Sequence, residues 1–344
     1  MKINMIGFSS KGCALAKRIA GELKEHECRY FGKTSGDRHG AASVVSTDKW
    51  TADSFRTCDA VIFVGAAGIA VRYIAPYIKD KAKDPAVIVI DELGRNIIPI
   101  LSGHLGGANK LSETIGKRIG GNVIITTATD INNVFSADTF ASENNMHIDN
   151  LEMVKTVSAR LLEGKPVHIK SDVKIEGELP KGITYADSGD VGIFITTSAE
   201  PGPFKKTLRL IPKNMTIGVG THRGIDTATV EERVLSTLSK NNISMHSVRA
   251  GGSIDLKRNE KGLVEFFEKY KIPITFFTKE ELEAVKGKFT ASAYVKSITG
   301  VENVCERSAV AVSGGGKIIV RKDAGSGVTV AVAKKDKAIR FGDA

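Results

Sequence analysis

The chain has 344 residues, 42% of them hydrophobic and 26% charged, with a formal net charge of +10 and a pI of about 9.3. This length predicts two or three domains, each with enough residues to bury a core. The lysines and arginines are scattered or form short pairs such as Lys205-Lys206, and no basic stripe is interleaved with aromatic residues. The charge therefore favours a polyanionic small molecule over nucleic acid as the partner.

The cysteines and the apolar stretches indicate a cytoplasmic protein. Cys13, Cys28, Cys58 and Cys305 lie far apart without CxxC spacing, which argues against a zinc site or a disulfide framework and for a reducing compartment. The first residues enter a predicted strand directly and lack the pattern of a signal peptide. The longest apolar stretch, residues 60–71, is too short to span a bilayer, so no membrane contact is expected.

Residues 1–133 are predicted to form an amino-terminal αβ domain. An amphipathic helix is predicted at 11–25, and buried strands are predicted at 2–9, 60–66, 86–91 and 122–128. Strands rich in Val and Ile that alternate with helices are typical of a mostly parallel sheet covered on both faces.

Glycines and polar residues follow three of these strands, at Gly65–Gly68, Asp91-Glu92 and Thr126–Asp130. Ligands of parallel sheets collect beyond the carboxyl ends of the strands, so these segments are expected to meet in a site. The Gly65–Gly68 loop lacks the lysine and the hydroxyl residue of a Walker motif. It is either an anion cradle built from backbone amides or a plain strand-to-helix turn.

Residues 87–109 combine a strand that ends at Asp91, His104 within SGHLGGAN, and a helix that opens at Gly106-Gly107. The first amides of a helix lack partners and attract anions. A histidine flanked by glycines is little packed, and its unperturbed pKa of about 6.5 suits proton transfer near neutrality. Asp91 is expected to orient His104 or to act as a base, and a turn or helix cap is the alternative.

Residues 134–212 are predicted to form a small middle α+β domain, with helices at 136–146 and 150–163 and strands at 166–171, 191–197 and 207–212. Residues 213–344 are predicted to form a second, carboxy-terminal αβ domain. It starts with the strand 216–220 and ends in a hairpin at 317–335, where Ala-Gly-Ser-Gly separates two Val/Ile-rich runs.

The loop Gly218–Gly224 follows a predicted strand with GxGxxxG spacing, whereas the dinucleotide fingerprint is GxGxxG. Arginine presents a bidentate fork to carboxylates, so Arg223 and the glycine amides are expected to grip such a group. A tight turn that needs positive φ is the alternative. Cys305 has no histidine near it in sequence and is predicted to be buried rather than nucleophilic.

Three segments together resemble the cobalt-precorrin-5A hydrolase family of the oxygen-independent cobalamin pathway. They are VGAAGIAVR (64–72), SGHLGGANKL (102–111) and VKSITGVENVCERSAV (295–310). The resemblance covers nearly the whole chain, with three domains in the same order. One loop departs from the family form GxGCRxG, because Thr221 replaces the cysteine and His222 the first arginine, while Arg223 remains as an anion clamp.

The resemblance implies an enzyme whose substrate is an anionic cobalt-containing tetrapyrrole with a δ-lactone between its ring A acetate and its C20 bridge. Water opens the lactone, and C20 leaves with its methyl group as acetaldehyde, which gives cobalt-precorrin-5B. No cofactor or protein-bound metal is expected, because the cobalt arrives with the substrate. The expected catalytic residues are His104 and Asp91. The expected substrate-binding residues are Gly65, Ala66, Gly68, Gly103, Gly106, Gly107, Asn109, Thr127, Asp130, Gly220, Thr221, Arg223 and Ser297.

Two other functions stay open at this point. The first is a non-catalytic carrier that passes tetrapyrrole intermediates between pathway enzymes, with which transient contacts are expected in any case. The second is a basic nucleotide or nucleic-acid binder, whose affinity would fall steeply with salt. Release of acetaldehyde distinguishes the hydrolase from both.

Overall fold

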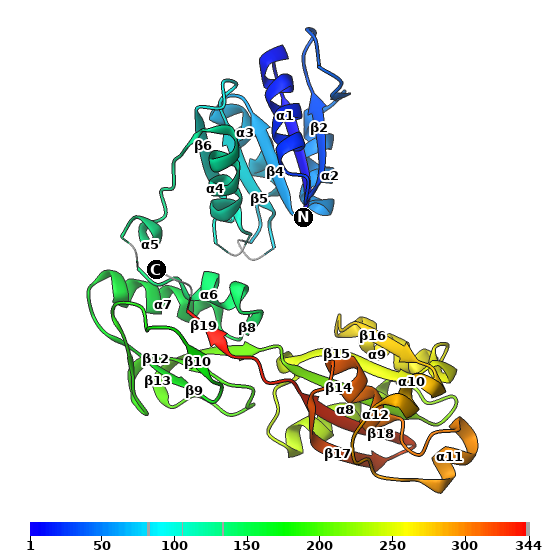
Figure 1. Ribbon diagram of the computed structural model, residues 1–344. Coiled ribbons are helices and arrows are strands. Elements are labelled where there is room, and N and C mark those ends of the chain that lie inside the picture. The colour runs from blue at the N-terminus through cyan, green and yellow to red at the C-terminus, as the bar shows by residue number, and fades with distance from the viewer. Residues whose placement is uncertain (81–82, 105, 133, 342–344) are drawn as a thin grey trace. The chain divides into compact units, whose positions relative to one another are not determined.

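The structure is a computed structural model that describes residues 1–80, 83–104, 106–132 and 134–341. The chain divides into two compact units, Met1–Thr139 and Phe140–Ala344 (Figure 1). Both units pack helices on sheets that contain several parallel strand pairs, which confirms the predicted α/β class. The division into three domains, with boundaries after residues 133 and 212, stays a prediction. Within the described residues, no helix is long and apolar enough to cross a membrane.

The first unit contains a seven-stranded sheet in the order β3-β2-β1-β4-β5-β6-β7. The five strands from β3 to β5 are parallel, β6 is antiparallel to β5, and β7 is parallel to β6. The strands are β1 (Lys2–Gly7), β2 (Glu27–Gly32), β3 (Ala42–Ser43), β4 (Ala60–Val64), β5 (Ala86–Ile90), β6 (Asn96–Leu101) and β7 (Asn122–Val123).

Helices cover both faces of this sheet because its central strands are apolar on both sides (Figure 1). On one face α1 (Ser10–Glu22) and α4 (Ala108–Ile119) pack their apolar residues against Ile3 and Met5. On the other face α2 (Thr47–Thr57) and α3 (Ala67–Ile74) pack against neighbouring strand residues. The remaining helices are η1 (Ala75–Tyr77), α5 (Ala128–Ile131) and α6 (Ala137–Glu143).

The prediction of a strand at 122–128 is wrong for most of these residues. Only Asn122–Val123 pairs with the sheet, and α5 begins at Ala128. Strand β2, for which no prediction was made, pairs in parallel with β1 although its exposed positions carry charged residues. The parallel pairing of β1, β4 and β5 confirms the mostly parallel sheet that the Val- and Ile-rich runs predicted.

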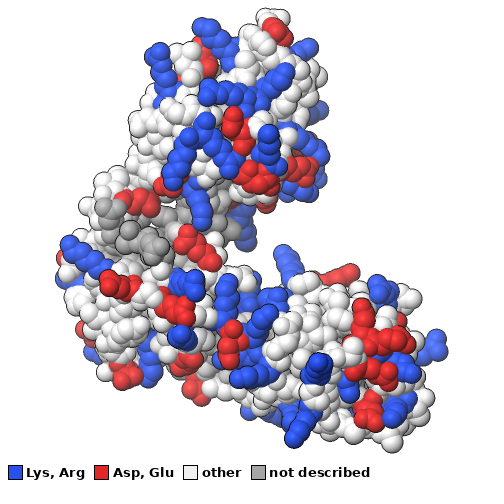
Figure 2. Space-filling model, in the orientation of Figure 1, with Lys and Arg blue, Asp and Glu red and all other residues white. Residues whose placement is uncertain are grey.

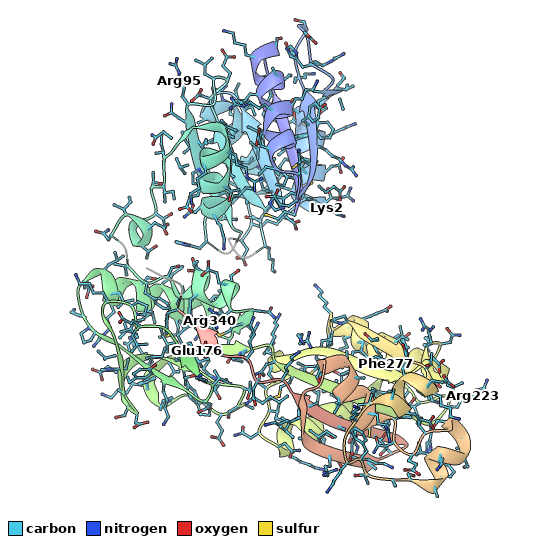
Figure 3. The ribbon with its side chains drawn as sticks, in the orientation of Figure 1. Lys2, Arg95, Glu176, Arg223, Phe277 and Arg340 are labelled. Carbon is cyan, nitrogen blue, oxygen red and sulfur yellow. The ribbon has the colours of Figure 1, made fainter. Side chains whose placement is uncertain are left out.

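The second unit contains two five-stranded sheets. The first has the order β11-β9-β12-β13-β8, with only β8 antiparallel to its neighbour. Its elements are β8 (Met146–Ile148), α7 (Leu151–Leu162), β9 (Val167–Ser171), β11 (Ile183–Tyr185), β12 (Gly189–Ile195) and β13 (Phe204–Pro212). The short strands β10 (Ile175–Glu176) and β19 (Ile339–Arg340) pair with each other, and their Glu176 and Arg340 form an ion pair at 3.0 Å (Figure 3).

The second sheet has the order β16-β15-β14-β18-β17, in which β14, β15 and β16 are parallel and β17 and β18 form the predicted hairpin. Its strands are β14 (Met215–Thr221), β15 (Val248–Ile254), β16 (Ile274–Phe277), β17 (Lys317–Gly325) and β18 (Val328–Lys334). Its helices are α8 (Thr227–Lys240), η2 (Met245–Ser247), η3 (Asp255–Lys257), α9 (Lys261–Lys269), α10 (Lys279–Ala284), α11 (Ala293–Thr299) and α12 (Cys305–Ser313).

Helix α12 lies directly on the backbone of this sheet, because two strand glycines leave room for it. A Cβ atom on Gly218 would overlap the carbonyl oxygen of Cys305, and one on Gly252 would come within 2.8 Å of the Ser308 carbonyl oxygen. Gly218 therefore serves close helix–sheet packing in this fold, rather than the phosphate contact of a dinucleotide fingerprint.

Glu306, in the first turn of α12, is fully buried and satisfied by hydrogen bonds. Its carboxylate accepts from the Thr290 amide and hydroxyl at 2.9 and 2.7 Å and from the Lys322 amide at 2.9 Å. Arg321 lies 3.6 Å away. These contacts join α12 to β17 and to the segment before α11.

Replacing Glu306 with alanine is expected to destabilise the protein by about 3–5 kcal/mol, because the buried donors lose their acceptor. Urea unfolding followed by circular dichroism measures the change. Glu302→Ala is the control, since Glu302 is exposed and its ion pair with Lys296, at 3.0 Å, lies at the surface; a loss below about 1 kcal/mol is expected there. Equal effects of the two substitutions would contradict this role of Glu306.

The same carboxylate predicts a pH dependence. Burial raises the pKa of Glu306, but the hydrogen bonds from Lys322 and Thr290 outweigh burial and lower it below its ordinary value. Such a group contributes stability above its unfolded pKa of about 4.3, and this contribution disappears as pH falls through the folded pKa. Below about pH 4.3 the wild type is therefore expected to lose stability more steeply than Glu306→Gln. Parallel pH profiles of the two proteins would refute this.

Candidate functional site

A polar cluster surrounds His104 at the end of β6 in the first unit. His104 Nδ1 lies 2.8 Å from the Thr139 hydroxyl, and Nε2 lies 3.1 Å from the Thr129 hydroxyl and 3.6 Å from Asp130 Oδ2. The side-chain amide of Asn109 donates to the same Asp130 oxygen at 2.8 Å. We call these five residues the His104 cluster. It brings together three residues that the sequence predicted for a site, His104, Asn109 and Asp130.

The glycine loop next to His104 uses its amides internally. Gly107, which has a φ of 79° and caps α4, donates its amide to the His104 carbonyl oxygen at 3.0 Å. The backbone amide of Asn109 donates to the Gly103 carbonyl oxygen at 3.1 Å. The backbone amides of Gly107 and Asn109 therefore close the loop and are not free to bind an anion, contrary to the expected cradle. Leu105 of this segment lies outside the described residues.

The other two glycines of the loop are required by crowding. A Cβ atom on Gly103 would lie 2.8 Å from Asn109 Oδ1, and one on Gly106 would overlap the side chain of Ser102. Thr127 lies beside the cluster, since its hydroxyl is 3.5 Å from Asn109 Nδ2. The glycines thus allow the chain to fold back so that Asn109 reaches Thr127 and the cluster.

Asp91 does not reach His104, because β5 and β6 are antiparallel. Asp91 follows the end of β5 and His104 follows the end of β6, so the strand length of roughly 17 Å separates them. Asp91 accepts hydrogen bonds from the amides of Leu93, Arg95 and Asn96, and Figure 3 labels Arg95 at this end of the sheet. Burial raises the pKa of Asp91, but these bonds outweigh burial and lower it. The expected pairing with His104 is corrected: Asp91 caps its own turn, and Asp130 is the carboxylate beside the histidine.

Gly65, Ala66 and Gly68 lie at the same end of the sheet as Asp91, because they follow β4 and Asp91 follows the parallel strand β5. The Gly65 amide donates to the Ile90 carbonyl oxygen at 2.8 Å. Ala66 is the N-cap of α3, and Gly68 lies in its first turn. The three segments expected to converge therefore lie at two opposite ends of the strands. Of these segments, only Thr126–Asp130 lies at the same end as His104.

The second unit contains a cavity of about 680 Å³ at the carboxyl ends of β14 and β15, the usual place for a ligand in a parallel sheet. Its wall is largely apolar and includes Ile254, Leu256, Tyr294 and Ile298. Leu256, Tyr294 and Ile298 are each 59–65% exposed. Large apolar side chains left exposed around one cavity indicate a surface for a ligand with an apolar face.

Cationic side chains and an unsatisfied hydroxyl complete the cavity lining. His222, Arg223, Lys257 and Lys322 all line it. Lys257 pairs with Glu260 at 3.2 Å, and the Glu260 carboxylate also accepts the Gly224 amide at 2.6 Å. Among the interactions of the described residues, none engages the Arg223 guanidinium, which is exposed in the same loop (Figure 3). Arg223 is therefore available for an anionic ligand group.

Gly220 and Thr221 of this loop also line the cavity, as the sequence predicted for a site in this loop. The Thr221 hydroxyl oxygen is buried and has no hydrogen-bond partner among the described residues. Ser297 belongs to α11, but it does not line the cavity, and its hydroxyl donates to the Tyr294 carbonyl oxygen of its own helix at 2.8 Å. Ser297 is thus placed beside the site rather than in it.

Cys305 is buried at the base of the cavity, which confirms the prediction that it is not exposed. Burial raises the pKa of its thiol to about 11, so the thiolate that would act as a nucleophile is scarce near neutrality. Leu256 and Ile298, which line the cavity, were not predicted for a site, because single apolar residues in short elements do not distinguish a ligand surface from a core.

Comparison with known proteins places all three regions of the chain in one family. The family models described as Cobalamin synthesis G N-terminal, Cobalamin biosynthesis central region and Cobalamin synthesis G C-terminus match residues 49–130, 135–212 and 215–333. These matches define the class, a multi-part α/β protein of cobalamin synthesis. The chain belongs to the cobalamin synthesis G family, whose curated relatives carry the name cobalt-precorrin-5A hydrolase.

The relative from Salmonella typhimurium is 33% identical over 277 residues, which cover 76% of this chain and 78% of the relative. The relative from Priestia megaterium is 32% identical over 304 residues, which cover 81% and 79%. A crystal structure of a cobalamin biosynthesis protein G homolog from Sulfolobus solfataricus is 22% identical, covers 97% of both chains and has a TM-score of 0.42.

The burial of Cys305 predicts slow alkylation. Iodoacetamide at pH 7.5 is expected to modify the half-buried Cys58 first and to leave Cys305 and Cys13 unmodified until urea is added. Peptide mass spectrometry measures the rates. Labelling of Cys305 in the folded protein as fast as Cys58 would contradict its burial at the start of α12.

Proposed function

We propose that this chain is a cobalt-precorrin-5A hydrolase of cobalamin biosynthesis. The observation that carries the proposal is the 32–33% identity, over about four fifths of the chain, to relatives that bear this name. In the proposed reaction, water adds to the δ-lactone carbonyl of cobalt-precorrin-5A and the acyl–oxygen bond breaks, which leaves the ring A acetate as a carboxylate. The two-carbon unit at C20 then leaves as acetaldehyde, and the product is cobalt-precorrin-5B.

The cavity of the second unit supports binding of such a substrate. A tetrapyrrole combines an apolar ring face with acetate and propionate arms at its rim. Tyr294 and Ile298 offer an apolar wall, and Arg223 offers a planar donor pair that fits a carboxylate. The net charge of +10 also favours a polyanion, and Figure 2 shows lysines and arginines spread over the visible face rather than gathered in one stripe.

The His104 cluster is the best candidate for proton transfer in the first unit. An imidazole can take a proton from the attacking water and return it to the leaving oxygen. Asp130 places a carboxylate 3.6 Å from Nε2, beside the ring that carries the proton in this transfer. Thr129 and Thr139 hold the two ring nitrogens and thereby fix the ring plane. In this proposal His104 is the catalytic residue and Asp130 a positioning residue.

Acetaldehyde release from cobalt-precorrin-5A tests the function and the role of His104 together. The wild type is expected to form one acetaldehyde per lactone opened. His104→Ala is expected to lower kcat by about 100-fold or more, the usual contribution of a general acid or base. His39→Ala is the control, because His39 lies in the same unit beside Asp37, at 3.3 Å, and outside the cluster. A wild type that binds the pigment without releasing acetaldehyde would indicate a carrier instead.

Arg223→Ala is expected to raise KM for the tetrapyrrole by about 10- to 150-fold, since a hydrogen bond to a charged group contributes roughly 1.5–3 kcal/mol. Arg223→Lys should recover part of this loss, because it restores the charge without the planar fork. Arg29→Ala removes the same charge from the exposed surface of the first unit, where Arg29 pairs with Glu27 at 2.9 Å. Equal KM values for Arg223→Ala and Arg29→Ala in steady-state kinetics would show that Arg223 does not bind the substrate.

A further inference from the structure

Three possible metal ligands meet in the second unit, away from the cavity. His147 lies in β8, and Asp149, two residues after His147, directly follows that strand, so both side chains point to the same side. His246 comes from η2, which leads into β15 of the other sheet. The ligand atoms of the three side chains all lie within 4.8 Å of one another.

The two imidazole rings are stacked, with centroids 3.8 Å apart and an angle of 13° between their planes. Among the described residues, neither ring has a hydrogen-bond partner for its nitrogens. An imidazole nitrogen that has no hydrogen-bond partner can offer its lone pair to a metal ion.

We propose that His147, Asp149 and His246 bind one divalent transition-metal ion of the zinc type. Two imidazoles and one carboxylate are a donor set that zinc and similar ions prefer, whereas Mg²⁺ and Ca²⁺ require oxygen ligands. Zinc holds such donors at about 2.0–2.2 Å, which puts its ligand atoms roughly 3.4 Å apart. Rotation of the exposed His246 side chain closes the remaining gap.

The carboxylate of this site is already held in place. Arg209 Nη1 lies 2.8 Å from Asp149 Oδ2, and Arg209 also donates to the Ser198 carbonyl oxygen at 2.6 Å. Metal-binding carboxylates are commonly oriented by such a partner. Two of the three donors are imidazoles, and this again selects against Mg²⁺ and Ca²⁺.

The ion would connect the two sheets of the second unit. His147 and Asp149 belong to the edge strand of the first sheet, and η2 immediately precedes β15, whose far end carries Ile254 of the cavity. A metal ion that binds the folded protein but not the separated ligands raises stability. The proposal is independent of the hydrolase function, because none of the three ligands lines the cavity or belongs to the His104 cluster.

The test uses the full-length protein, freed of metal with a chelator and then titrated with ZnCl₂ or CoCl₂. One equivalent of Zn²⁺ is expected to bind in calorimetry and to raise the thermal midpoint, and Co²⁺ is expected to give visible d–d bands. His246→Ala and Asp149→Asn, both at exposed positions, should each weaken Zn²⁺ binding at least 10-fold and reduce the midpoint shift. His168→Ala is the matched control, since His168 lies on β9 of the same sheet, two strands away from β13, the partner of β8, and its Nδ1 lies 3.2 Å from the Thr184 hydroxyl.

Zn²⁺ binding that is unchanged in both His246→Ala and Asp149→Asn, or equally weakened in His168→Ala, overturns the proposal. Absence of binding to the wild type overturns it as well. Equal responses to Mg²⁺ and Zn²⁺ would refute the assignment to imidazole ligands. None of these outcomes bears on acetaldehyde release, so failure here is distinguishable from failure of the proposed hydrolase function.

Discussion

The contact of α12 with the backbone of β14 and β15 is the constraint on which the second unit depends. Gly218 and Gly252 carry no side chains, so the helix can lie at a distance that any Cβ would prevent. This position buries the thiol of Cys305 and the carboxylate of Glu306. The same contact sets the base of the cavity between the strand ends and α11. An apolar wall and an available arginine are then presented together at the mouth of the cavity.

The two units contribute different chemistry to the proposed hydrolase. The first offers an imidazole whose two nitrogens are held by threonine hydroxyls and which has Asp130 beside it. The second offers a cavity with an apolar wall and Arg223 at its rim. Lactone opening needs both kinds of group, because water must lose a proton and a large polyanionic ring must be bound. In the proposed hydrolase, the groups suited to proton transfer and those suited to substrate binding therefore belong to separate sheets.

The sequence predicted those elements whose residues strongly prefer one kind of secondary structure. Buried Val- and Ile-rich strands such as β4 and β5 were recognised from their apolar runs, and the β17–β18 hairpin from its glycine turn. Strand β15 was missed because Gly251-Gly252-Ser253 lacks β-branched residues, and that composition is explained only by the helix packed on it. The direction of β6 was also undetermined by its apolar pattern, which is why Asp91 was paired with His104 in error. The identity of β15 and the direction of β6 depend on which distant segments pair with them, and the local sequence does not specify those partners.

The most direct test of the central claim is the fate of water oxygen during the reaction. The enzyme is incubated with cobalt-precorrin-5A in water enriched in oxygen-18, and the tetrapyrrole product is analysed by mass spectrometry. If water attacks the lactone carbonyl, as proposed, the ring A acetate carboxylate of the product carries one heavy oxygen. A ring A acetate without heavy oxygen, or an unopened lactone in the presence of active protein, would contradict a hydrolytic function.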